Sequence, residues 1–239
     1  MELSGAEAVL AAVVVGLGAL LQGSIGFGFA LVAAPVLVFL DPHLVPGPLI
    51  VAGAPFMLLL AWRERGSMEF SALGAPLTGQ LAGILLALAF LSFVDGRALS
   101  IAVALVVLLG AILSASGLHL QPTRRNFVLG GILAGFMGTT SSIPGPALAL
   151  IHQHVSPARM RGALAPFFLV GGLVAFLGLV STGQMRWEGF LVGLGLALPA
   201  LIGLGVSTWT APRVNQSLAR PAVLIFATLA SLGLLYRSI

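Results

Sequence analysis

The chain of 239 residues is 59% hydrophobic and 8% charged, and its mean hydropathy is +1.11. No water-soluble globular domain can expose such a composition, so the sequence predicts an all-α polytopic membrane protein without a separate soluble domain. The formal net charge is +4, but the basic residues are arginines in short loops, which indicates membrane topology rather than a nucleic-acid-binding surface. Cysteine is absent, which excludes disulfides, thiolate metal sites and cysteine nucleophiles.

The first 40 residues predict a broken membrane helix. Residues 1–7 are acidic and lack the basic leader of a signal peptide, so the apolar run 8–21 is expected to be retained. That run and the next, 30–40, are uncharged, and each has about half of the ~20 residues that a spanning helix needs. Unwound backbone inside a membrane is tolerated only where it is buried in protein or lines a cavity. The polar, glycine-spaced break between the two runs is therefore a candidate site.

A second break follows about half a chain later, at residues 138–146. Aligning Gly23 with Gly138 gives both halves one plan, in which a broken helix precedes three long apolar spans. The sequence therefore predicts two membrane repeats, residues 1–120 and residues 121–239. The long spans are expected at residues 44–62, 70–93 and 99–118, and again at 162–180, 189–210 and 217–236.

The loop charges predict how the two repeats are oriented. If each broken helix enters and leaves the membrane on one side, all loops with net positive charge lie in the cytoplasm and both ends of the chain lie outside. The second repeat is then inverted relative to the first, as in many secondary transporters. Short arms favour two re-entrant hairpins beside six full spans, and ten short spans remain the alternative. The positive loops contain Arg63 with Arg65, Arg124 with Arg125, Arg159 with Arg161, and Arg213 with Arg220.

Together the two breaks form a candidate anion site near the bilayer midplane. Half-helices that start near Phe27 and Gly145 would direct free backbone N–H groups and positive dipole ends at a ligand. Neutral side-chain donors suit a transported anion, because a buried arginine is costly and would hold the anion too tightly. Gln80, deep in a long span, lines the path or bonds to a neighbouring helix. The substrate-binding candidates are Gln22, Gly23, Ser24, Gly26, Phe27, Gly28, Gln80, Thr139, Thr140, Ser141, Ser142, Pro144 and Gly145.

Close helix packing is the competing interpretation for any single glycine or serine, because small residues let membrane helices approach each other. Two breaks at equivalent places in two repeats favour a binding site, since inverted-repeat transporters place their sites at matched discontinuous helices.

The run QGSIGFGFALVAAP at residues 22–35 and the run GTTSSIPGP at residues 138–146 resemble the sulfite exporter TauE/SafE family of bacterial membrane permeases. Ile143 and Pro144 stand where that family usually has more glycine. The resemblance implies a secondary transporter of the bacterial cytoplasmic (inner) membrane that moves sulfite, a sulfonate or a related organic anion. The matching letters are Gln22, Gly23, Gly26, Phe27, Gly28 and Pro35, then Gly138, Ser142, Gly145 and Pro146.

Two other functions would use the same residues differently. A passive anion channel would have the same dipole-lined site without alternating access. An intramembrane serine hydrolase would need a base beside Ser24, Ser141 or Ser142, and no serine and histidine share a predicted helix face. The sequence has no HExxH motif and no intramembrane pair of acids, so we expect no enzymatic activity, no metal and no cofactor.

The expected partners are a small anionic substrate and the lipid bilayer. His152 and His154 would carry protons if transport is coupled to a proton gradient, although a position at the membrane edge favours a loop role. A homodimer is expected only by analogy with other carriers.

Overall fold

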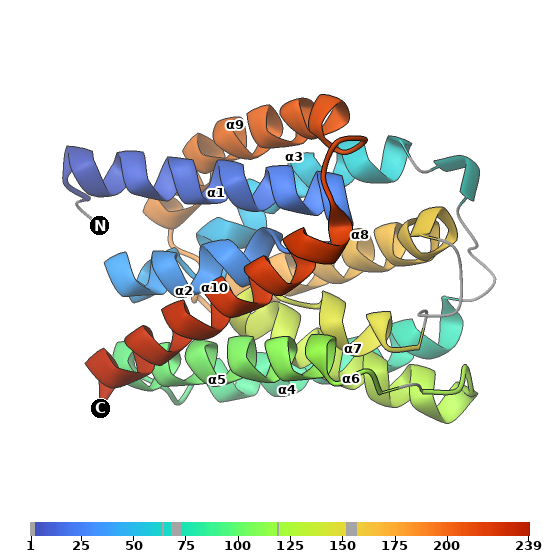
Figure 1. Ribbon diagram of the computed structural model, residues 1–239. Coiled ribbons are helices and arrows are strands. Elements are labelled where there is room, and N and C mark those ends of the chain that lie inside the picture. The colour runs from blue at the N-terminus through green and yellow to red at the C-terminus, as the bar shows by residue number, and fades with distance from the viewer. Residues whose placement is uncertain (1–2, 64, 68–72, 119, 152–156) are drawn as a thin grey trace.

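The computed structural model describes residues 3–63, 65–67, 73–118, 120–151 and 157–239 (Figure 1). These residues form ten α-helices, two short 3-10 helices and no β-strand, so the predicted all-α class is confirmed. The first half contains α1 (Gly5–Ile25), α2 (Phe29–Leu40), η1 (Pro42–Leu44), α3 (Gly47–Arg63), η2 (Arg65–Ser67), α4 (Gly74–Leu91) and α5 (Gly96–Ala115). The second half contains α6 (Arg124–Ser141), α7 (Gly145–Ala149), α8 (Pro157–Ser181), α9 (Trp187–Thr210) and α10 (Gln216–Ser238).

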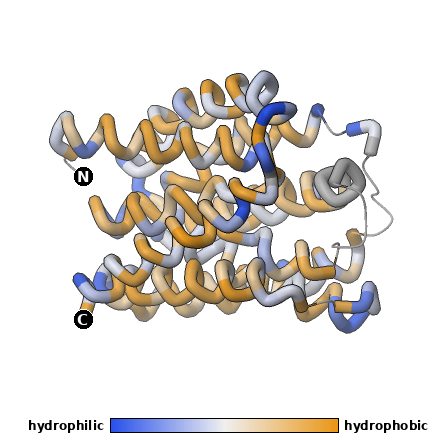
Figure 2. Tube along the Cα trace, viewed as in Figure 1, coloured by the Kyte–Doolittle hydropathy of each residue, from blue (hydrophilic) through white to orange (hydrophobic). Residues whose placement is uncertain are grey.

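Seven helical segments of the described chain are long and apolar enough to cross a membrane. Apolar residues run along these helices, while hydrophilic residues lie mainly at helix ends and connections (Figure 2). The chain is therefore a multi-pass membrane protein, with α1 as a long helix in addition to the predicted spans. The seven segments are α1, the stretch Pro42–Arg63 with η1 and α3, then α4, α5, Ala163–Ser181 of α8, α9 and α10.

The first break begins later than the sequence predicts. α1 continues through Gln22, Gly23 and Ser24 and ends at Ile25, so its 21 residues form a full-length helix instead of a half-length arm. The helix can continue because all three of these residues are buried against other parts of the protein. Gly26 ends it in the left-handed conformation, and the N–H of Gly26 donates to the carbonyl oxygen of Gln22. The outgoing arm, α2, is short as predicted and has 12 residues.

The second break also begins late, because α6 continues to Ser141 and only residues 142–144 separate it from α7. The hydroxyl of Thr140 donates to the carbonyl oxygen of Phe136 at 2.8 Å, and that of Ser141 donates to the carbonyl oxygen of Met137 at 2.7 Å. Hydroxyls that bond to their own helix are compatible with its continuation. α7 then has only five residues, so the two broken helices differ in length.

The helices run back and forth along one axis, and both ends of the described chain lie at the same end of the bundle (Figure 1). α1 packs against α9 and α2, α4 packs against α6 and α8, and α10 packs against α5 and α2. The end of α3, at Arg63, and the start of α6, at Arg124, lie at the opposite end (Figure 1). Two of the basic loops thus share one end of the bundle, in agreement with the charge pattern.

Four glycines determine how closely α4 and α6 approach. A Cβ atom added at Gly79 or Gly83 would collide with main-chain oxygens of α6, and one at Gly131 or Gly135 would collide with main-chain oxygens of α4. The two backbones therefore touch directly, which is how small residues stabilise helix pairs in lipid, where the hydrophobic effect does not drive association. Since α4 carries Gln80 and α6 leads into the second break, this contact fixes their relative position.

α2 lies in the interior of the bundle. Most of its residues are buried, and it contacts α1, α5 and α10. The ring of Phe29, its first residue, stacks on the ring of Phe56 in α3 with 5.2 Å between the ring centroids. The helix that follows the first break therefore starts inside the protein, where its first N–H groups can face a buried site.

Candidate functional site

The first break consists of Gly26, Phe27 and Gly28. Gly26 has φ +88° and Gly28 has φ +123°, conformations that side chains disfavour and glycine accepts. The N–H of Phe29, at the start of α2, donates to Oε1 of the buried Gln22 at 3.1 Å. Gln22 therefore satisfies one of the main-chain donors that a helix start leaves open, and it holds α1 and α2 together at the turn.

Gly23 and Ser24 contact the last turns of α9. A Cβ atom at Gly23 would collide with Oγ of Ser207, so the absence of a side chain lets α1 and α9 approach each other. Oγ of Ser24 lies 3.3 Å from Oγ1 of Thr210, where α9 ends. Both residues thus take part in the contact between α1 and α9.

Phe27 and Gly28 contact the first turns of α10. The guanidinium carbon of Arg220 lies 5.2 Å from the centroid of the half-buried Phe27 ring. A Cβ atom at Gly28 would lie 3.6 Å from a methyl group of Val223. The first break is thus adjacent to the end of the bundle where α9 connects to α10.

Ser142 forms the start of the second break. Its φ of 62° is in the left-handed region, which is strained for a residue with a side chain. Its hydroxyl donates to the carbonyl oxygen of Pro46 at 3.3 Å, which links the second break to the segment before α3. Pro144 precedes α7, and a Cβ atom at Gly138 would lie 3.1 Å from Cβ of Pro144. The turn is therefore tightly closed on the end of α6.

A cavity of about 600 Å³ lies between α3, α4, α6, α8 and α9, and we call it the central cavity. It is open to the outer surface of the bundle, where the exposed side chains of Leu58, Leu173 and Leu194 line it. Thr139, Ser142 and Pro144 line it from the second break, Gln80 lines it from α4, and Phe29 lines it from the start of α2. Most of the remaining wall is apolar, and none of the described residues that line the cavity is charged. The few polar groups in this wall therefore determine which molecules the cavity can bind in a fixed orientation.

Two polar atoms in this wall have no hydrogen-bond partner within the described protein: Oε1 of Gln80 and Oγ1 of Thr139. Gln80 is 4% exposed and Thr139 is 0% exposed. Buried polar atoms are nearly always bonded, and an unsatisfied one costs about 1–3 kcal/mol. Both atoms have less than 1 Å² of accessible surface, so a polar molecule in the cavity would reach them only after their side chains turn toward it.

Gly171 of α8 provides the space that the Gln80 side chain occupies. A Cβ atom at Gly171 would collide with the amide group of Gln80, whereas one at the neighbouring Gly172 would meet no atom within 4 Å. Gly171 and Phe29 are not among the site residues expected from the sequence. Two sequence features could have identified them: the pair of adjacent glycines in an apolar span, and the position of Phe29 directly after the last glycine of the first break.

The structure brings only part of the predicted site together. Gln80, Thr139, Ser142 and Pro144 line the central cavity. His152 and His154 lie outside the described residues. The remaining candidates do not line the central cavity and are Gln22, Gly23, Ser24, Gly26, Phe27, Gly28, Thr140, Ser141 and Gly145.

Metal ligation or a serine–histidine pair would require particular groupings among the described residues. These residues contain no group of three or more acids and histidines close enough to hold a metal ion. None of the three candidate serines bonds to a histidine of the described residues. Ser24 bonds to Thr210, Ser141 to Met137 and Ser142 to Pro46. What the wall of the central cavity presents is neutral hydrogen-bonding groups in apolar surroundings.

Comparison with known proteins gives one match. The profile of the family described as sulfite exporter TauE/SafE matches residues 10–234, which is nearly the whole chain. No curated protein and no solved structure matches the chain. The family match covers both breaks and every helix that lines the central cavity.

Proposed function

The chain belongs to the sulfite exporter TauE/SafE family of membrane transporters, and from this premise we propose that it is a secondary transporter for a small anion. It is a multi-pass protein of the bacterial inner membrane. The proposed substrate is sulfite, a sulfonate or a related organic anion. The proposed binding site is the central cavity, with Gln80, Thr139 and Ser142 as the groups that contact the anion.

The unsatisfied atoms of Gln80 and Thr139 carry this proposal. Both atoms are enclosed in this conformation, so anion binding would turn the two side chains toward the cavity, where the Thr139 hydroxyl and Nε2 of Gln80 donate to the anion. The cavity would then present neutral donors and no charge, so an anion is held by hydrogen bonds that water can replace on either side of the membrane. Such a site avoids the cost of burying a cation.

The first break supports the site indirectly. α2 begins at Phe29 beside the central cavity, so the positive end of its dipole lies on that side. Gln22 fixes this helix start through its bond to the Phe29 N–H. We therefore propose a positioning role for Gln22 and for the glycines of the first break, in place of direct contact with the anion.

Two helix contacts support the proposed inverted repeats, residues 1–120 and 121–239. A Cβ atom at Gly131 of α6 would collide with the carbonyl oxygen of Pro76 in α4, and one at Gly16 of α1 would lie 3.3 Å from the carbonyl oxygen of Pro199 in α9. Gly16 and Gly131 have the same separation in the sequence as Gly23 and Gly138. The first helix of each repeat thus packs against the fourth helix of the other repeat: α1 against α9, and α6 against α4. Two repeats related by a twofold axis would form this pair of equivalent contacts.

A ligand panel tests the proposed site. The thermal unfolding of the detergent-purified protein is measured with sulfite, sulfate, thiosulfate, sulfoacetate, taurine and small carboxylates. An anion at 100 times its dissociation constant stabilises the protein by about 2.7 kcal/mol through mass action. We expect one anion to stabilise the wild type and Thr140→Val, but not Gln80→Leu or Thr139→Val. If no anion stabilises the wild type, or if all variants respond equally, the central cavity is not an anion site.

A further inference from the structure

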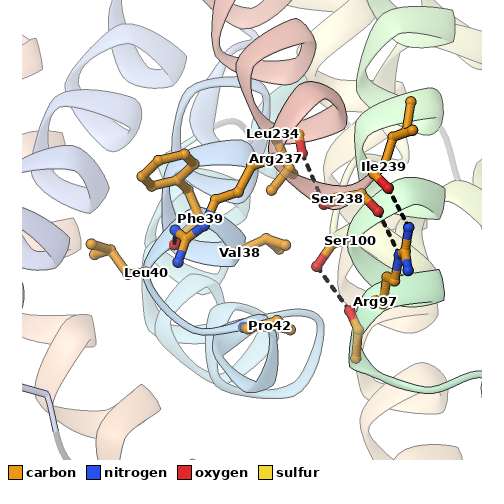
Figure 3. Close-up of a pocket in the computed structure, with 11 residues that line it drawn as sticks. Val38, Phe39, Leu40, Pro42, Arg97, Ser100, Leu234, Arg237, Ser238 and Ile239 are labelled. Atoms are coloured by element: carbon orange, nitrogen blue, oxygen red, sulfur yellow. Dashed lines mark hydrogen bonds between the residues drawn. The ribbon is translucent and has the colours of Figure 1, made fainter.

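A second cavity, of about 450 Å³, lies between the end of α2, the start of α5 and the end of α10 (Figure 3). We call it the edge cavity, because these helix ends lie at the end of the bundle that holds both chain ends (Figure 1). Arg97 of α5 and Arg237 of α10 both line it. Unlike the central cavity, it therefore combines two arginine side chains with apolar side chains.

The arginines are held in place by main-chain oxygens. Nε of Arg97 donates to the carbonyl oxygen of Ser238 at 2.7 Å, and its Nη2 donates to the main-chain oxygen of Ile239 at 2.5 Å (Figure 3). Nη1 of Arg237 donates to the carbonyl oxygen of Phe39 at 2.6 Å, and its guanidinium carbon lies 4.4 Å from the Phe39 ring centroid. A guanidinium group has five N–H donors, so each arginine keeps donors that the described residues do not use.

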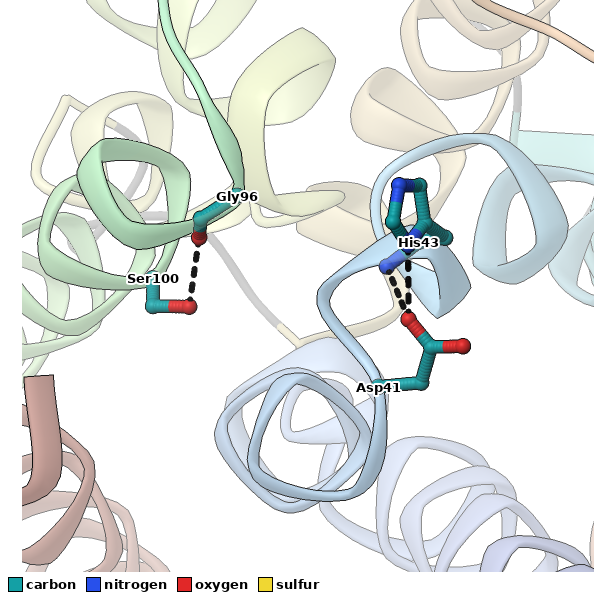
Figure 4. A network of polar contacts seen from close by, with 4 residues as sticks. All are labelled: Asp41, His43, Gly96 and Ser100. Atoms are coloured by element: carbon teal, nitrogen blue, oxygen red, sulfur yellow. Dashed lines mark hydrogen bonds and ion pairs between the residues drawn. The ribbon is translucent and has the colours of Figure 1, made fainter. Parts of the chain in front are cut away.

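The acids nearest in sequence to this cavity bond within their own turns. Oδ1 of Asp41 accepts from the backbone N–H of His43 at 2.8 Å and lies 2.8 Å from its Nδ1 (Figure 4). Oδ1 of Asp95 accepts from the N–H of Ala98 at 2.7 Å. Neither acid lines the edge cavity. Arg237 therefore has no acidic side chain of the described wall as a partner, while Arg97 is already bonded through two of its nitrogens to the main-chain oxygens of Ser238 and Ile239.

The rest of the wall suits the boundary between lipid tails and headgroups. Val38 and Leu234 are buried apolar residues of the edge cavity, and Leu40 completes its apolar side. Phe93 and Tyr236, on the neighbouring helix ends, are each 89% exposed. Exposed aromatic side chains at helix ends are typical of the membrane interface. The exposed tyrosine and the place of the cavity at one end of the bundle favour a depth where lipid phosphate groups meet the hydrocarbon core.

We infer that the edge cavity binds the phosphate group of an anionic phospholipid. Guanidinium groups bind phosphate oxygens through charge-assisted and often paired hydrogen bonds. Arg97 and Arg237 would hold the phosphate, while Val38, Leu40 and Leu234 contact the adjoining glycerol and upper acyl chain. α2 extends from Phe29 at the central cavity to the edge cavity, so a bound lipid would also fix the far end of the helix that begins at the transport site.

A lipid titration tests this inference. Short-chain phosphatidylglycerol, short-chain phosphatidylcholine and glycerol phosphate are each added to the protein in zwitterionic detergent, and the unfolding temperature is followed. We expect phosphatidylglycerol alone to raise it. Arg97→Gln and Arg237→Gln should each weaken the apparent affinity for phosphatidylglycerol about fivefold, as expected for loss of one basic residue near a lipid surface.

Arg65→Gln is the matched control for Arg237→Gln. The Arg65 guanidinium also donates to a main-chain oxygen, that of Trp62 at 2.9 Å, and lies 4.5 Å from the Trp62 ring centroid, but it does not line the edge cavity. This variant should bind phosphatidylglycerol like the wild type. If a glutamine variant fails to fold, Arg237→Lys keeps the charge, removes the paired donors and should still lower the affinity. Equal responses of all variants, or equal stabilisation by phosphatidylcholine, would overturn the site. Equal stabilisation by glycerol phosphate would show that the cavity binds a phosphate group without a lipid, and would refute a phospholipid as its ligand.

Discussion

Replacing Thr139 by valine should stabilise the unliganded protein while abolishing anion binding. Valine has the shape of threonine and suits the same helical rotamer, so the change exchanges one hydroxyl for one methyl group. The hydroxyl of Thr139 is fully buried and has no partner among the described residues. Removing an unsatisfied buried polar group should relieve about 1–3 kcal/mol. In a chain of this size, each 1 kcal/mol corresponds to about 2–4 °C in the unfolding temperature.

Thr140→Val is the control, because Thr140 is the adjacent residue and is equally buried. Its hydroxyl donates to the carbonyl oxygen of Phe136 at 2.8 Å, and it does not line the central cavity. Loss of this satisfied bond should cost about 0.5–1.5 kcal/mol, so the two variants should shift the unfolding temperature in opposite directions. Thermal unfolding in detergent measures both shifts. If Thr139→Val destabilises as Thr140→Val does, the Thr139 hydroxyl is bonded within the protein and is not free for a ligand.

Further substitutions test the groups around the central cavity. Gly171→Ala should displace the Gln80 amide and weaken the apparent anion affinity about tenfold, the loss expected for one hydrogen bond to a charged group. Gly195→Ala in α9, where an added Cβ meets no atom within 4 Å and which does not line the central cavity, should leave the affinity unchanged. Equal effects of the two alanines would refute the proposed orientation of Gln80. Gln22→Leu should leave the N–H of Phe29 without a partner and lower the free energy of unfolding by about 1–3 kcal/mol, measurable by thermal unfolding without ligand. Unchanged stability of Gln22→Leu would mean that the start of α2 does not depend on this bond.

The overall class follows from the sequence because composition leaves no alternative, but the helix ends do not. Gln22, Gly23 and Ser24 are typical of a break, yet they remain helical, since each is buried in a contact with another part of the protein. The helix propensity of the local sequence gives no information about these tertiary contacts. The short α2 was predictable, because an apolar run of its length between a glycine turn and Asp41 allows little else.

The residues that line the central cavity were predictable only in part for a related reason. Thr139, Thr140 and Ser141 are similar in sequence, but helical geometry turns consecutive side chains in different directions. The hydroxyls of Thr140 and Ser141 bond to their own helix, while Thr139, whose hydroxyl has no partner among the described residues, is the one of the three that lines the central cavity. Gln80 was identifiable, because an amide deep in an apolar span needs a partner wherever the helix turns it.

Substrate counterflow tests the central claim most directly. Proteoliposomes are loaded with unlabelled sulfite, or with whichever anion stabilises the protein, and the entry of a trace of labelled anion is followed in wild type and Gln80→Leu. A carrier with its site in the central cavity predicts a saturable, transient accumulation of label in the wild type and none in the variant. Entry of label that increases linearly with concentration and without accumulation, or equal accumulation in the variant, would contradict a carrier that binds its anion at Gln80.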